Sequence, residues 1–275
     1  MGIQTVKDVV NNKDKYESNL TNYTNDLIKR ANPLMVDELC RLRAFEPDTV
    51  KESSIFYIGD MAEMLLPKYF DEIGDFGIIS ETNHKPIFRN RWVMPIRNPQ
   101  GEVQNFVGYS PYADERYIYG TSKYYRRRDT LYGLENLQMA YDLGYAFITE
   151  GITDTIRMRD LGYKNSFAMC GTHKSEYIKR QLNRCKHGVI LIPDRDDAGL
   201  GALKGWQFNR SVTVFINFQY KDVDEMCVIK KEDGSRVKNE ENIEWLKSYL
   251  DASVEWLKSD VHNGNQSHCE KITVL

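Results

Sequence analysis

Residues 188–199 read GVILIPDRDDAG, in which an apolar run ends in three aspartates within four positions. An uninterrupted apolar run of this length is typical of a strand that is buried on both faces of a parallel sheet. Functional side chains in such sheets collect where the strands end. The stretch therefore predicts an α/β domain with Asp194, Asp196 and Asp197 at the functional edge of its sheet.

The sequence around this stretch repeats the same alternation of apolar strands and helices. We expect strands at 145–150, 165–170, 188–194 and 212–217, and helices at 153–162, 173–185 and 197–209. Continuous apolar strands joined by helices of about ten residues predict βαβ units, with a parallel sheet covered on both faces.

Carboxylates close two of the expected strands: Glu150 follows the first, and Asp194 and Asp196 follow the third. Side chains at i and i+2 of an extended chain point to the same side, and a glutamate from a neighbouring strand end can converge on them. Three close carboxylates repel one another unless a cation lies among them, and such hard oxygen ligands suit Mg²⁺ or Mn²⁺. The alternative is that the aspartates only cap the next helix and line its first turn.

A second acidic pair follows the last strand in YKDVDEM, where Asp222 and Asp224 are again two positions apart. Alone, this pair indicates a solvated loop. After another parallel strand, however, it brings two more carboxylates to the same edge of the sheet. Two or more metal ions beside basic residues are suited to phosphoryl transfer.

The N-terminal part is expected to be a mixed lobe of helices and strands. Three helices are predicted, at 21–31, 33–45 and 58–73, the last of them interrupted by Pro67. Residues 91–110 alternate around the turn sequence NPQG at 98–101 and predict a β-hairpin with Arg97 at the end of its first strand. The fold class is thus α/β in the second half and α+β overall.

The segment 85–128 is basic, with nine Lys or Arg against three Asp or Glu, although the whole chain has a net charge of −3. Six tyrosines lie in the same segment. Basic residues interleaved with aromatic ones suit a surface that binds phosphates and stacks bases. A charged, solvated face over a half-buried sheet is an equal alternative.

Composition limits the class of protein. The chain has 275 residues, 41% of them hydrophobic, which is enough for one large globular domain or two smaller ones. Because no apolar run reaches about 18 residues and the N-terminus lacks a signal-peptide pattern, we expect a soluble, cytoplasmic protein with no membrane partner. The five cysteines are scattered and never spaced as CxxC, so neither a disulfide framework nor a zinc site is expected.

The motifs of the second half resemble the Toprim signature. They are Glu150-Gly151 with Asp154 three residues after the glycine, then Gly171-Thr172, then DxDxxG at 194–199. The resemblance covers residues 145–225 and implies the Toprim parallel-sheet fold, which bacterial-type primases, type IA and type II topoisomerases and some nucleases share. The fold alone does not choose among these reactions.

The preceding segments, RNRWVMPIRNPQGEVQNFVGYS, RYIYGTS and YRRRDTLYGL, are similar to those of DnaG-type DNA primases, and the similarity runs from about residue 20 to 225. The resemblance implies that Glu150, Asp194 and Asp196 are catalytic and bind metal. It also places Asp222 and Asp224 among the metal ligands. Nucleotide and template binding are implied for Arg43, Arg97, Arg116, Lys123, Arg127 and Asp154.

The resemblance implies a DNA primase core that makes short primers, with RNA expected, on single-stranded DNA by metal-dependent nucleotidyl transfer. Its cofactor would be Mg²⁺ or Mn²⁺ without zinc, and its partners template, nucleoside triphosphates and a replicative helicase. A Toprim nuclease and a non-catalytic single-strand-binding replication protein are the alternatives. A topoisomerase is not expected, because the chain is short for the extra domains that such enzymes need.

The sequence also departs from the family. We expect no zinc-binding domain before the core and no large C-terminal helicase-binding domain, so the protein resembles a minimal primase of a phage or mobile element. The expected divisions are a primase-core lobe at 1–137, the Toprim domain at 138–225 and a C-terminal helical segment at 226–275. The last segment carries an apolar stripe that is expected to pack on the core, with contact to a partner as the alternative: Ile243, Leu246, Leu250, Val254 and Leu257.

Overall fold

The computed structural model describes residues 6–80, 84–171, 175–202, 205–206, 208–216, 219–259 and 270–272. The chain divides into two compact units, of which the first is Met1–Leu39 with Val50–Arg126 and the second is Cys40–Thr49 with Arg127–Leu275. Within the described ranges, no helix combines the length and the hydrophobicity that crossing a membrane requires.

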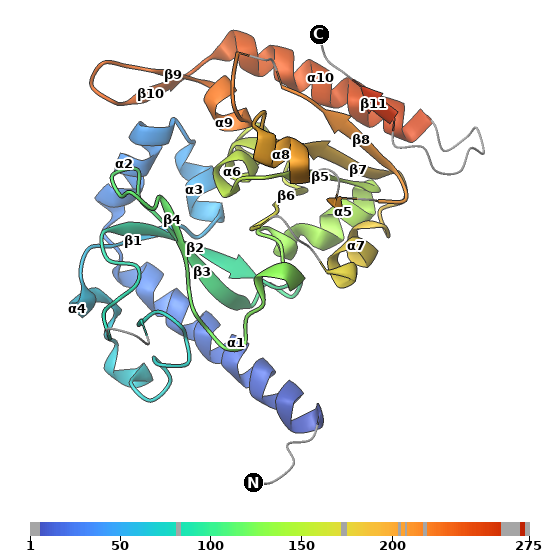
Figure 1. The fold of residues 1–275 in the computed structure, drawn as a ribbon. Coiled ribbons are helices and arrows are strands. Elements are labelled where there is room, and N and C mark those ends of the chain that lie inside the picture. Colours follow the sequence, from blue (N-terminus) through green and yellow to red (C-terminus); the bar gives the residue numbers. More distant parts are fainter. Residues whose placement is uncertain are drawn as a thin grey trace. The chain divides into compact units, whose positions relative to one another are not determined.

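The first unit is built on a four-stranded antiparallel sheet in the order β1-β2-β3-β4 (Figure 1). Its strands are β1 Phe56–Ile58, β2 Arg91–Arg97, β3 Val103–Tyr109 and β4 Tyr117–Tyr119. The predicted hairpin is confirmed, since β2 and β3 pair from Trp92 opposite Tyr109 to Arg97 opposite Val103. Gly101 closes its turn at a φ of +84°, a conformation that glycine adopts without strain.

The helix α1 Val6–Arg30 packs against β3 and supplies four buried side chains to the core of the first unit: Tyr16, Leu20, Tyr23 and Leu27. The predicted start of this helix at residue 21 is wrong, because the helix begins at Val6. The hydroxyls of Thr21 and Thr24 do not cap a helix. Each donates 2.7 Å back to the carbonyl oxygen four residues earlier, within one continuous helix.

The predicted helix at 58–73 is also wrong. Residues 56–58 form β1, because Phe56 and Ile58 point together into the core. Only the short helices α4 Met61–Met64 and η1 Pro67–Tyr69 follow, and Pro67 begins the second one. The other helices near the N-terminus are α2 Pro33–Arg43 and α3 Pro47–Glu52.

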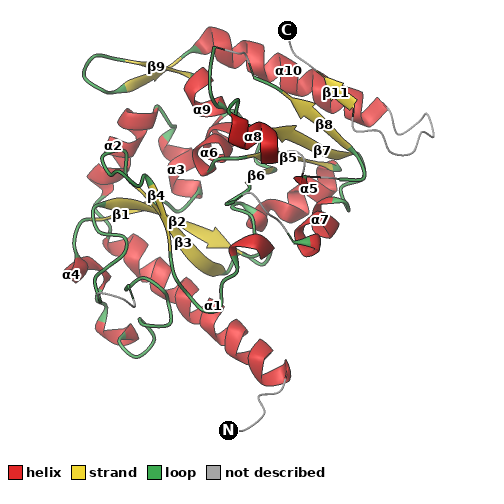
Figure 2. Cartoon of the chain, in the orientation of Figure 1, coloured by secondary structure: helices red, strands yellow, loops and turns green. Residues whose placement is uncertain are grey.

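The second unit contains the predicted parallel sheet, in the order β11-β8-β7-β5-β6 (Figures 1 and 2). Its strands are β5 Tyr145–Thr149, β6 Ser166–Ala168, β7 Gly188–Ile192, β8 Ser211–Val214 and β11 Glu270–Ile272. The opening stretch supplies β7, which lies at the centre and is buried along its whole length. Strand β11 was not predicted from the sequence.

Helices cover both faces of this sheet, and the alternation of side chains assigns each helix to a face. Phe147 and Ile190 share one hydrophobic cluster with α6 Ile152–Asp160 and α10 Glu240–Ser259. Ile148 and Leu191, one position further along the same strands, share the opposite cluster with other helices. Those helices are α5 Leu137–Leu143 and α7 Glu176–Leu182.

The C-terminal apolar stripe packs on the core as predicted, because all five of its side chains belong to the cluster that covers β7 and β8. An antiparallel hairpin that was not predicted precedes α10 and consists of β9 Val228–Lys230 and β10 Arg236–Lys238. The remaining short helices are η2 Arg127–Asp129, η3 Leu134–Asn136, α8 Asp197–Ala202 and α9 Val223–Met226.

Replacing Leu246 by alanine is expected to destabilise the protein by about 2–5 kcal/mol, since the side chain is fully buried between α10 and the sheet. The matched control is Leu143→Ala on α5, whose side chain is 44% exposed. The control should cost less than about 1 kcal/mol. Urea unfolding followed by circular dichroism measures both changes, and equal losses would contradict this account of the core.

Candidate active site

Three predicted carboxylates meet at the carboxyl ends of β5 and β7. Glu150 follows β5 directly, and Asp194 lies two residues after β7. The backbone N–H of Asp194 donates to the Glu150 carboxylate, which joins the two strand ends. One oxygen of Glu150, Oε2, is buried and has no hydrogen-bond partner among the described residues. Such an oxygen remains available for a further ligand.

Burial and mutual repulsion oppose ionisation of these groups. The pKa of Asp194 is raised to about 7, mainly by burial and then by the charges of Glu150 and Asp222. The pKa of Glu150 is raised as well, mainly by burial and then by Asp196. Carboxylates that are held together in this way bind cations strongly, since a cation relieves the repulsion.

A lysine that the sequence analysis did not single out lies against the acidic cluster. The Nζ atom of Lys221 is 3.1 Å from Asp196 Oδ2 and 3.7 Å from Asp194 Oδ2. In the described part of the chain, no group of three or more His, Cys, Asp or Glu side chains already has the arrangement of a metal site. The only signal in the sequence was a lysine directly before the second acidic pair.

The turn after β7 fixes Asp196 and leaves no room for a side chain at Gly199. The backbone N–H of Gly199 donates 2.8 Å to Asp196 Oδ1. A Cβ atom on Gly199 would lie 2.4 Å from the carbonyl oxygen of Asp194 and 2.8 Å from Glu150 Oε2. Asp197, the third aspartate of the opening stretch, is exposed and begins α8.

The second acidic pair separates into two different environments. Asp222 is the N-cap of α9 and accepts a 2.7 Å hydrogen bond from the backbone N–H of Glu225. Burial raises its pKa. Asp224, two residues later, has a side chain that is only 1% exposed.

Three arginines surround the Asp224 carboxylate. Its Oδ2 lies 2.5 Å from Arg43 Nη2 and 2.8 Å from Arg236 Nη1, and its Oδ1 lies 3.1 Å from Arg157 Nη2. A carboxylate occupied by three guanidinium groups has little capacity left for a metal ion. This arrangement disfavours the ligand role that the sequence predicted for Asp224, and it places Arg43 in an internal ion pair.

Arg157 also holds the segment 40–49, which belongs to the second unit although it precedes most of the first in sequence. Its guanidinium donates to the backbone carbonyls of Arg43 and Ala44 and lies over the ring of Phe45 at 4.6 Å. The residue itself is fully buried. Its positive charge is balanced by Asp224 and Asp160.

Asp154 is buried behind this edge of the sheet. Its Oδ1 accepts a 2.9 Å hydrogen bond from the backbone N–H of Asp224. Its pKa lies well above the usual value, mainly because of burial and then because of Asp222 and Asp194. Asp154 is only 3% exposed, so its side chain contacts other parts of the protein and does not face a template.

Arg127 lies near the end of a third strand of the sheet. Its Nε donates to the carbonyl oxygen of Cys170, two residues after β6. Gly171, at a φ of +142°, would place a Cβ only 3.2 Å from that nitrogen. The structure therefore puts one predicted basic residue at the carboxyl end of β6, in the same sheet whose β5 and β7 ends carry the acidic cluster.

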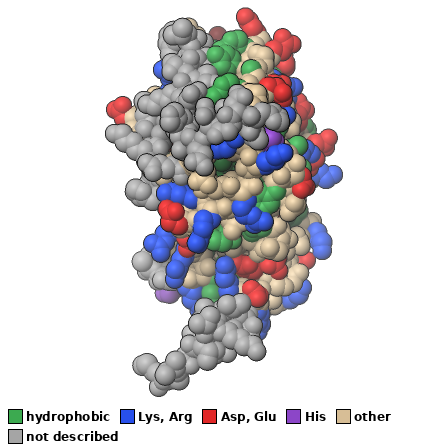
Figure 3. Space-filling model, turned by 90° about the vertical axis from the view of Figure 1, so that its right-hand side faces the viewer, with side chains coloured by type: hydrophobic (Ala, Val, Ile, Leu, Met, Phe, Trp, Pro, Cys, Tyr) green, Lys and Arg blue, Asp and Glu red, His purple; other side chains and the backbone are tan. Residues whose placement is uncertain are grey.

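Three further predicted basic residues belong to the first unit, namely Arg97, Arg116 and Lys123. Arg97 donates 2.7 Å to the carbonyl oxygen of Gly101 within the hairpin, and Arg116 is exposed. Lys123 pairs with Asp75 at 2.6 Å and lies over the ring of Tyr124 at 5.1 Å. Figure 3 shows Lys and Arg side chains recurring over one face of the molecule, with acidic side chains between them.

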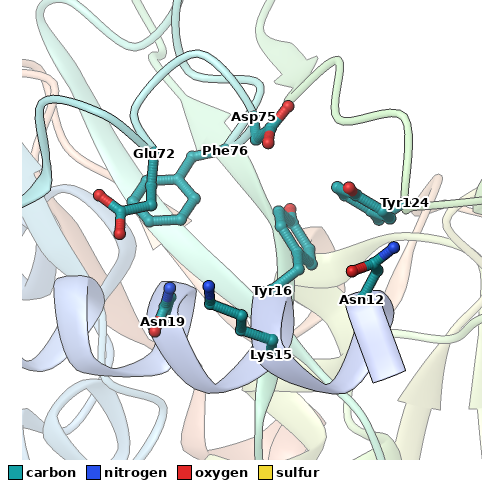
Figure 4. A pocket seen from close by; sticks show the side chains of 8 residues that line it. All are labelled: Asn12, Lys15, Tyr16, Asn19, Glu72, Asp75, Phe76 and Tyr124. Atoms are coloured by element: carbon teal, nitrogen blue, oxygen red, sulfur yellow. The ribbon is translucent and has the colours of Figure 1, made fainter. Parts of the chain in front are cut away.

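A pocket of about 180 Å³ lies between α1 and the segment after η1, with Tyr124 in its lining (Figure 4). Its lining is Asn12, Lys15, Tyr16, Asn19, Glu72, Asp75, Phe76 and Tyr124. The rings of Tyr16 and Tyr124 lie 4.7 Å apart and form an aromatic wall. Polar and aromatic groups thus meet in the part of the first unit that carries Lys123.

Comparison with known proteins agrees with this architecture. Residues 147–227 match the Toprim-like family. The chain is 26% identical over 234 residues to the DNA primase of Thermotoga maritima, and the match covers 74% of this chain and 41% of that protein. The chain therefore spans less than half of the length of that relative.

Two solved structures are similar in fold. The zinc-binding and RNA polymerase domains of Aquifex aeolicus primase match with a TM-score of 0.68 and 22% identity, over 88% of this chain and 62% of that one. A DnaG primase catalytic domain bound to single-stranded DNA matches with a TM-score of 0.68 and 17% identity, over 87% of this chain and 80% of that one.

Replacing Asp224 by asparagine is expected to destabilise the protein by about 3–5 kcal/mol, because three arginines then lose a buried counter-charge. Asp196→Asn is the matched control, since this side chain is 41% exposed and belongs to the repelling cluster. It should change stability by less than about 1 kcal/mol. Chemical unfolding at pH 7 without divalent metal makes the comparison, and a smaller loss for Asp224→Asn than for the control would contradict it.

The stability of the metal-free protein should depend on Asp194 between about pH 4 and 7. A carboxyl with a raised pKa binds more protons in the folded than in the unfolded protein. Its contribution is therefore complete below the unfolded pKa of about 3.9 and is lost as the pH rises through about 7. Asp194→Asn should flatten this part of the profile, measured by unfolding in a chelator at each pH. An unchanged slope would show that Asp194 has an ordinary pKa.

Proposed function

Because the chain carries a Toprim-like domain in the fold of DnaG-type primase catalytic cores, we propose that it synthesises short primers on single-stranded DNA by metal-dependent nucleotidyl transfer. The observation that carries the proposal is the cluster of Glu150, Asp194 and Asp196 at two adjacent strand ends. A binding module has no need to hold repelling carboxylates together, whereas a metal-dependent polymerase does.

The chemistry of the cluster suits a hard divalent ion, for which we propose Mg²⁺ or Mn²⁺ without zinc. All of its donors are carboxylates, and one Glu150 oxygen is buried without a hydrogen-bond partner in the described part of the chain. Glu150, Asp194 and Asp196 would hold this ion, and Asp222 would support a second one. When bound, such an ion would supply positive charge against the phosphates and would lower the pKa of the attacking 3′-hydroxyl.

The remaining predicted residues have supporting roles in this proposal. Asp224 acts through its arginines and keeps the segment around Arg43 in place, rather than as a metal ligand. Arg127 supplies positive charge at the end of β6 for the phosphates of the incoming nucleotide. Asp154 stabilises the segment of Asp222 and Asp224 by accepting a hydrogen bond from the backbone N–H of Asp224.

The template would be bound by the first unit. Arg97, Arg116 and Lys123 supply charge for its phosphates, and Tyr124 and its neighbouring tyrosines supply stacking surfaces. Support comes from the similar fold of a primase catalytic domain whose structure contains single-stranded DNA. The substrates would be nucleoside triphosphates, a replicative helicase would be a partner, and the cytoplasm would be the place of action.

The direct test incubates the protein with single-stranded templates, labelled nucleotides and Mg²⁺ or Mn²⁺. Short products should form, and Asp194→Asn should reduce them by at least about a hundredfold, because loss of a ligand removes several kcal/mol of charge stabilisation. The matched control is Asp197→Asn, an exposed carboxylate of the same turn. It should retain activity within about threefold.

The outcomes separate the competing functions. Shortened template in place of new strands, lost in Asp194→Asn, would indicate a Toprim nuclease. Single-strand binding without any product would indicate a non-catalytic protein. Equal losses in Asp194→Asn and Asp197→Asn would contradict the assignment of the site, even if primers form.

A further inference from the structure

We propose that Lys221 occupies the place of the divalent cation between Asp194 and Asp196 until a metal ion displaces it, and that it thereby sets the affinity of the site for metal. This inference rests on the proposed function in one respect, which is that Asp194 and Asp196 bind the metal. Nothing in the sequence motifs assigns a role to Lys221.

The first support is the position of the ammonium group. Its Nζ lies within 3.7 Å of both Asp194 and Asp196, which leave the sheet from the end of β7. A cation that bridges two carboxylates needs such a position, and an ammonium there offsets one unit of their repulsion. Lys221 therefore reduces the repulsion between these two carboxylates, as a divalent metal ion would do with twice the charge.

The second support is that hydrogen bonds fix the backbone of Lys221, whereas its side chain is largely exposed. The carbonyl oxygen of Lys221 accepts from the backbone N–H of Arg195 at 2.8 Å, and its own N–H donates to Glu225 Oε2 at 2.6 Å. The side chain is nevertheless 56% exposed. The ammonium can thus swing into water by rotation of its side chain, without any change in the backbone.

The third support is the difference between the cation and its partners. The Asp194 side chain is only 15% exposed, so it stays at the strand end when the lysine leaves. Asp196 is held by the backbone N–H of Gly199 through Oδ1, whereas the lysine contacts Oδ2. Release of Lys221 therefore removes an ammonium group from carboxylates that remain in place.

Competition predicts that removing the lysine strengthens metal binding. In Lys221→Met, Mn²⁺ should bind on the order of tenfold more tightly, since one unit charge a few ångströms from the ion is removed. Lys221→Arg keeps the charge and should change the affinity less. The matched control is Lys258→Met on α10, which removes an exposed lysine paired with Glu255 at 3.0 Å and should leave the affinity within about twofold.

The affinity is measured by Mn²⁺ titration, with free Mn²⁺ followed by electron paramagnetic resonance and no nucleotide present. A second measurement follows amine acetylation of Lys221 by mass spectrometry. Saturating Mn²⁺ should raise its reactivity several-fold, and Asp196→Asn should raise it without metal. The reactivity of Lys258 serves as the internal reference in each sample.

Each outcome decides one of the two proposals. Wild-type protein that binds no Mn²⁺ would overturn the metal site of the proposed function, and the role of Lys221 with it. Wild-type protein that binds Mn²⁺ with the same or higher affinity than Lys221→Met would overturn the role of Lys221 alone. Acetylation of Lys221 that Mn²⁺ does not change would also overturn it.

Discussion

Repulsion between carboxylates is the constraint on which the second unit depends. A parallel sheet brings the ends of its strands to one edge, and this chain places acidic residues after β5, β7 and β8. Every acidic side chain at that edge therefore needs a cation, a hydrogen-bond donor or a proton. The surrounding residues can be understood as the means by which each carboxylate obtains one.

The carboxylates solve this problem in two ways. Asp224 is neutralised by three arginines inside the protein, and the Asp222 carboxylate accepts the backbone N–H of Glu225 in the first turn of α9. Glu150 and Asp194 lack such a fixed counter-charge among the described residues, and their pKa values are raised; the cation that pairs with Asp194 there is Lys221, whose side chain is largely exposed. Fixed counter-charges belong to the architecture, whereas an incompletely neutralised pair is suited to a ligand that comes and goes.

Much of the fold could be predicted because it depends on local patterns. The apolar run of β7, the turn of the hairpin and the stripe of α10 each lie within a few residues of sequence. The length of α1 could not, because Thr21 bonds to its own helix as readily as it would cap one. The hairpin of β9 and β10 is too short to give a clear alternating pattern.

The candidate site, like the fold, could be predicted only as far as local sequence patterns encode it. Motif spacing indicated which acids lie at the sheet edge, but not what neutralises each of them. Asp224 contacts Arg43, which is far away in sequence, and Lys221 reaches back to aspartates that follow a different strand. Pairings of this kind depend on the register of distant segments, which no local pattern encodes.

The contacts of Arg157 have a consequence for dividing this protein into pieces. The guanidinium is buried against the backbone carbonyls of Arg43 and Ala44. The second unit, which contains the parallel sheet, is therefore not a continuous piece of sequence. A fragment that starts at residue 127 would remove both carbonyl acceptors and leave this buried guanidinium with Asp160 and Asp224 as its acceptors, at a cost of about 1 kcal/mol for each lost hydrogen bond. Part of the first unit lies between the two segments of the second unit in sequence. A single cut in the chain therefore cannot release the second unit complete.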